Sequence, residues 1–74
     1  MKTVHVECYS GSRYGERPIA VYWSGQRLEI RQVLRSWRTP DGAGFDVVVD
    51  VERKFRLLYD EKYDTWSIVD LEVE

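Results

Sequence analysis

Alternation of apolar and polar residues constrains the fold of this chain more than any other feature. The alternation runs through residues 3–8, 19–23, 45–50, 54–59, 66–68 and 69–74, with polar or glycine-containing stretches between most of these runs. Successive side chains of a strand point to opposite faces, so a period of two predicts strands rather than helices. The 74 residues are too few to fill a second core. The sequence therefore predicts one all-β domain over residues 1–74, built as an antiparallel meander of about six strands.

The predicted strands also carry apolar residues on their second face. Tyr22, Leu34, Val48 and Leu58 fall on the side opposite the main apolar row. An open sheet with one solvated face does not need these residues. They favour a curled sheet or small barrel, or a sheet covered by a partner.

Residues 28–38 fit two local structures. Ile30, Val33, Leu34 and Trp37 have helical spacing, which leaves a short helical turn open. The stretch nevertheless begins by alternating and lacks an N-cap residue, and its parity changes at Arg31–Gln32, as at a β-bulge. These features favour a long bent strand. A second parity change at Ile68–Val69 predicts a second bend, and the sequence of residues 39–44 predicts a turn.

The residues that carry most enzyme chemistry are scarce. The chain has one cysteine, Cys8, and one histidine, His5, so it can form no intrachain disulfide and no cysteine-based zinc site. We expect Cys8 to be buried and His5 to lie on the surface. Asp60, Glu61 and Asp64 share a turn but lack the glycine and terminal glutamate of a calcium loop. The sequence predicts a non-enzymatic protein with no cofactor, metal or catalytic residue.

Location is predicted from three further features. No segment approaches the ~20 apolar residues of a membrane helix. The first residues show no signal-peptide pattern, and a single cysteine suits a reducing compartment. We expect a cytoplasmic protein that does not bind membranes.

Charge is distributed unevenly along the chain. Residues 1–38 hold seven basic and three acidic residues, whereas residues 39–74 hold four basic and ten acidic residues. The basic half also carries aromatic residues, and this combination can hold phosphates while a base stacks. The candidate binding face consists of Arg17, Tyr22, Arg27, Arg31, Arg35, Trp37 and Arg38.

Two functions compete for this face. The alternative to binding is that the arginines pair with acidic residues of neighbouring strands, while at least two of the three tryptophans fill the core. An isoelectric point near 5.4 is unlike that of most nucleic-acid binders. A protein partner or self-association, through strand edges such as residues 69–74, is therefore favoured over nucleic acid.

Several short motifs resemble those of a known protein family. They are Val-Glu-Cys-Tyr-Ser-Gly at residues 6–11, Glu-Arg-Pro at 16–18, Tyr-Trp at 22–23 with Gly25, Val-Leu-x-x-Trp-Arg at 33–38, Leu-Leu-Tyr-Asp at 57–60, and Asp-x-Trp at 64–66. In this order they resemble a family of small bacterial cytoplasmic proteins of unknown function. Similar segments are appended to the C-terminus of some proteins related to error-prone DNA polymerases. The resemblance implies a β-rich cytoplasmic protein and transfers no catalytic residue.

Overall fold

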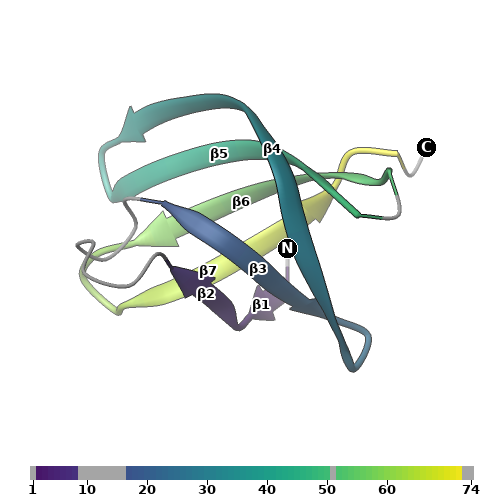
Figure 1. The fold of residues 1–74 in the computed structure, drawn as a ribbon. Coiled ribbons are helices and arrows are strands. Elements are labelled where there is room, and N and C mark those ends of the chain that lie inside the picture. Colours follow the sequence, from purple (N-terminus) through teal and green to yellow (C-terminus); the bar gives the residue numbers. More distant parts are fainter. Residues whose placement is uncertain (1, 9–16, 51, 73–74) are drawn as a thin grey trace.

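The computed structural model describes residues 2–8, 17–50 and 52–72, and every regular element in this part of the chain is a strand. The predicted all-β class and the curled, barrel-like sheet are confirmed (Figure 1). The seven strands are β1 (Lys2–Val4), β2 (Val6–Cys8), β3 (Pro18–Trp23), β4 (Gln26–Thr39), β5 (Gly42–Val49), β6 (Lys54–Asp60) and β7 (Thr65–Asp70).

All neighbouring strands pair antiparallel, and the sheet has the order β1-β7-β6-β5-β4-β3-β2. The two strands at the ends of this order, β1 and β2, are consecutive in the chain and are separated by His5 alone. Lys2 therefore pairs with Ile68 of β7, while Val6, four residues later, pairs with Val21 of β3. The N-terminal segment thus connects both edges of the sheet and nearly closes the barrel.

His5 marks the point where the first predicted strand divides. Its backbone carbonyl accepts a hydrogen bond of 2.9 Å from the Tyr22 N–H, so the link between β1 and β2 is itself bonded to β3. Alternation continues across residues 3–8, and the sequence pattern therefore predicts a single strand there. The strand count is one higher than predicted because this segment changes its pairing partner.

The stretch 28–38 is part of one long strand, β4, and contains no helical turn. β4 pairs with β3 over residues 26–29 and with β5 over residues 30–39, as Figure 1 shows where the strand curves over the barrel. The register shifts between Ile30 and Gln32, as the parity change predicted, and again between Val33 and Arg35. Such bulges bend a strand, which lets one chain segment belong to both sides of a curled sheet.

Three local predictions differ from the structure. The pairing of β6 with β7 runs without a register shift from Asp60↔Thr65 to Phe55↔Asp70, so no bulge accompanies the parity change at Ile68–Val69. The turn predicted over residues 39–44 is present but shorter, covering Pro40–Asp41, and β5 begins at Gly42. Leu71 and Glu72 form a turn rather than an extended C-terminal strand, and residues 73–74 lie outside the described residues.

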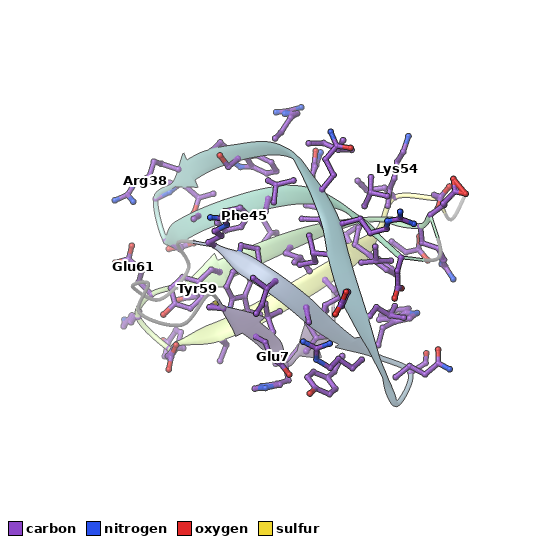
Figure 2. All side chains as sticks on the ribbon, in the orientation of Figure 1. Glu7, Arg38, Phe45, Lys54, Tyr59 and Glu61 are labelled. Carbon is purple, nitrogen blue, oxygen red and sulfur yellow. The ribbon has the colours of Figure 1, made fainter. Side chains whose placement is uncertain are left out.

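The core fills the barrel with the inward-facing residues of β3, β5, β6 and β7. Phe55, Leu57, Val21, Val47 and Val49 are its largest fully buried side chains. Trp66 is buried between Phe45 and Tyr59, with ring centroids 5.8 and 5.0 Å away. Figure 2 shows Phe45 and Tyr59 inside the curve of the sheet.

The other tryptophans depart from the expectation of two buried rings. Trp23 packs against the core and Trp37 lies on another surface, and both are half-buried. Trp66 is the buried tryptophan. Cys8 is half-buried against the core, and His5 is exposed as expected.

Adjacent leucines on β6 give a matched test of this arrangement. Leu57 points into the core with no exposed surface, whereas Leu58 is half-buried on the outer face. We expect Leu57→Ala to lower the free energy of unfolding by about 2–5 kcal/mol, because burial is lost and a cavity remains. Leu58→Ala should cost clearly less. Urea denaturation of both variants checks this, and equal losses would contradict the assigned faces.

Candidate binding surface

The residues predicted to form one binding face lie in separate places. Tyr22 and Arg27 belong to the β3–β4 hairpin, and Arg17 is exposed immediately before β3. Arg35 and Trp37 lie on the outer face of β4, since their register partners Asp46 and Gly44 alternate with the core residues Phe45 and Val47. Arg31 lies at the first register shift of β4, and Arg38 lies near its C-terminal end. The structure therefore divides the predicted face.

Tyr22 and Arg27 form a charge-compensated cluster around Glu7 of β2. The Tyr22 hydroxyl donates to Glu7 Oε2 at 2.6 Å, and Arg27 donates to both carboxylate oxygens, from Nε at 3.1 Å and Nη2 at 3.0 Å. The pairing β2–β3–β4 brings these side chains together across three strands. The exposed His5 ring packs at a tilt on Tyr22, with centroids 5.1 Å apart.

These hydrogen bonds determine the ionisation of the cluster. The Arg27 guanidinium and then the Tyr22 hydroxyl lower the pKa of Glu7 from 4.5 to about 2. The same carboxylate raises the pKa of Tyr22 and of Arg27 above their ordinary values. Arg27 also lies 3.5 Å from Glu29. The Tyr22 hydroxyl and the Arg27 guanidinium already donate hydrogen bonds to the Glu7 carboxylate. Tyr22 and Arg27 are therefore poorly suited to bind an external anion.

A second cluster occupies the outer face of β4, β5 and β6. We define this outer-face cluster as Arg35, Trp37, Gly44, Asp46 and Arg56. The Trp37 indole lies on the Gly44 backbone, where an added Cβ would overlap its Cε2 and Cζ2 atoms. The guanidinium carbons of Arg35 and Arg56 lie 5.1 and 5.2 Å from the indole centroid, within the range of cation–π attraction.

Arg56 and Arg35 differ in how their charges are compensated. Arg56 makes a bidentate pair with Asp46, at 2.8 Å from Nε and 3.1 Å from Nη2, and this pair lowers the pKa of the largely buried Asp46 carboxyl. Arg35 also lowers that pKa through its charge but makes no ion pair with any described residue. The cluster therefore keeps one uncompensated positive charge beside a half-buried indole.

The third feature is the edge of β4. Over residues 32–39, β4 pairs with β5 and with no other described strand, and we call this segment the β4 edge. Val33 and Leu34 on it are 42% and 44% exposed. Arg31 and Arg38 flank these two residues, and neither forms an ion pair within the described part of the chain.

Sequence reasoning identified only part of these surfaces. The sequence pattern places Gly44 in the predicted turn and gives no signal that singles out Asp46 or Arg56. A glycine between strand residues can mark a close approach, which was the available signal for Gly44. Within the described residues, Arg31, Arg35 and Arg38 form no ion pair with acids of neighbouring strands, contrary to the alternative interpretation. Arg27 pairs instead with Glu7 and Glu29.

Other features of the described residues give little support for a small-molecule site. Over residues 2–8, 17–50 and 52–72 no three His, Cys, Asp or Glu side chains are grouped closely enough to hold a metal ion. A hollow of about 590 Å³ beside the β4–β5 turn is lined mainly by polar groups, including Arg38, Asp41 and Glu61, whereas ligand pockets are mostly apolar. A hollow of about 190 Å³ near Leu58 and Ser67 is smaller than most ligand pockets. The described segments contain no helix long and apolar enough to cross a membrane.

Comparison with known proteins adds no family assignment. No family model, curated protein or solved structure matches this chain.

The Glu7 cluster gives a pH-dependent prediction. A folded-state pKa of about 2, against an ordinary 4.5, means that ionised Glu7 stabilises the fold above pH 4.5 and that this contribution is lost as pH falls toward 2. Glu7→Gln should flatten the dependence of unfolding free energy on pH in this window. Denaturation at several pH values tests this. Glu29→Gln, whose side chain is 68% exposed, should keep the wild-type dependence.

Proposed function

We propose that this protein is a non-enzymatic interaction module that binds an extended, acidic segment of a partner protein along the β4 edge. The one-sided pairing of residues 32–39 carries the proposal. A strand that lacks a neighbour presents unpaired N–H and C=O groups, and these accept an added strand. The curved barrel holds this edge in an extended conformation before any partner arrives.

The side chains along the edge favour a partner rather than an incidental opening. Val33 and Leu34 are among the few large apolar side chains exposed in the described part of the chain. A bound strand would cover them and gain the free energy of burying apolar surface, about 25 cal/mol per Å². Hydrogen bonds along the backbone would supply the rest of the affinity.

Charge selects the chemistry of the partner. Arg31 and Arg38 flank the exposed apolar pair, and their guanidinium groups have no ion-pair partner among the described residues. If two copies paired antiparallel through this edge, centred on Leu34–Arg35, Arg31 of one copy would lie beside Arg38 of the other. Like charges directly across a strand pair are destabilising. An acidic segment is therefore favoured over a second copy of this chain.

A peptide with alternating glutamate and valine residues tests this proposal. We expect it to shift the amide resonances of residues 32–39 in NMR spectra and to slow their hydrogen exchange, because the edge gains hydrogen-bond partners. The matched control is a peptide of equal charge in which every valine is replaced by proline, which cannot donate. Equal binding of the two peptides would contradict strand addition.

A variant of the edge gives an independent result. Leu34→Glu places a like charge against the acidic peptide and should weaken binding by about fivefold or more, as expected for a contact worth roughly 1 kcal/mol. Light scattering should show the protein alone to be monomeric at micromolar concentrations. A stable dimer whose formation is abolished by Leu34→Glu would favour self-association instead.

A further inference from the structure

We infer that the outer-face cluster is a binding site for single-stranded nucleic acid, with one base stacked on the exposed part of Trp37 and the adjoining phosphate held by Arg35. This site lies on the face of the sheet and does not depend on strand addition at the β4 edge. The described structure shows three features that such a site needs: a positioned aromatic ring, cations beside it, and no opposing carboxylate that lacks a partner.

The ring is positioned by its fit to the backbone. Trp37 and Gly44 are register partners, and the indole lies where the Gly44 side chain would otherwise be. The ring is therefore supported on one side by β5 while the residue as a whole stays half-buried. A supported indole with an exposed portion is a stacking platform, because every base has a π-face. A tryptophan needed only to fill the core would point inward, as Trp66 does.

Cations surround the ring on the same face. The guanidinium groups of Arg35 and Arg56 both approach the indole. Arg56 is engaged by Asp46, whereas Arg35 forms no ion pair within the described residues. Guanidinium groups contact phosphates and also stack with bases.

The acidic residue within the cluster does not cancel this charge. Both oxygens of Asp46 are bonded by Arg56, which leaves the charge of Arg35 uncompensated. The net negative charge of the chain therefore does not describe the surface around Trp37. A phosphate beside Arg35 would face the Asp46 carboxylate, whose two oxygens are already bonded.

The test is fluorescence anisotropy of a labelled short oligothymidylate at low salt. We expect saturable binding that weakens as salt rises from about 50 to 200 mM, because phosphate contacts release counterions. The matched probe is an abasic strand with the same number of phosphates. It should bind about tenfold more weakly, since base–aromatic stacking is worth roughly 1–3 kcal/mol. Equal binding of the two strands, or no binding at low salt, would overturn the inference.

Protein variants separate stacking from charge. Trp37→Ala should weaken oligothymidylate binding about tenfold and leave abasic-strand binding unchanged. Arg35→Ala should weaken both strands and reduce the salt slope by about 1. Arg27→Ala is the matched control, because this arginine is bonded to Glu7 and belongs to the other cluster. An effect of Arg27→Ala as large as that of Arg35→Ala would overturn the site.

Gly44→Ala provides a test that removes neither an aromatic ring nor a cation. The added methyl group would displace the indole from its support, and binding should weaken as in Trp37→Ala. If this variant does not fold, the Trp37→Ala result decides, because that change leaves the backbone of β4 and β5 intact.

The acidic peptide and the oligothymidylate should also bind to the protein at the same time. Full competition between them would assign both to one anion-binding surface and overturn a separate nucleic-acid site.

Discussion

The described structure depends on one constraint, which is that residues 2–8 pair with both edges of the sheet. β1 joins β7 and β2 joins β3, with His5 between them bonded through its carbonyl to Tyr22. Because the sheet must curl for these edges to meet at one short segment, the inward side chains of the other strands enclose a single core. The fully buried Phe55 and Leu57 are a consequence of that closure.

Closure also explains why β4 is the longest described strand and pairs with β3 over its first part and with β5 over the rest. It joins β3 to β5 across the strongest curve of the barrel, and the register shifts after Ile30 and after Val33 allow it to bend. Once it has left β3, only β5 pairs with it among the described strands. The same bend turns Trp37 onto the outer face, over Gly44. Both proposed binding surfaces are therefore products of one bent strand.

The electrostatics follow local geometry rather than the totals of the chain. Glu7 meets Arg27, Asp46 meets Arg56 and Asp70 meets Arg53, so these three acids are neutralised close to where they lie. Pairs with a solvent-exposed arginine contribute little to stability individually. Their main effect is on surface charge, because Arg31, Arg35 and Arg38 stay without ion pairs among the described residues. An acidic protein can in this way present a basic strand.

The sequence by itself determined the all-β class, the main strand faces and the first bend of β4. Alternation reports these features directly, because side-chain direction in a strand depends only on position along the chain. Only the tertiary structure decided that residues 3–8 divide at His5, that Tyr22 and Arg27 belong to Glu7, and that Gly44 supports Trp37. Each of these contacts joins residues far apart in sequence or in different strands. An alternating pattern gives the face of each side chain but cannot specify which strands pair. These contacts therefore depend on the strand pairing of the folded chain.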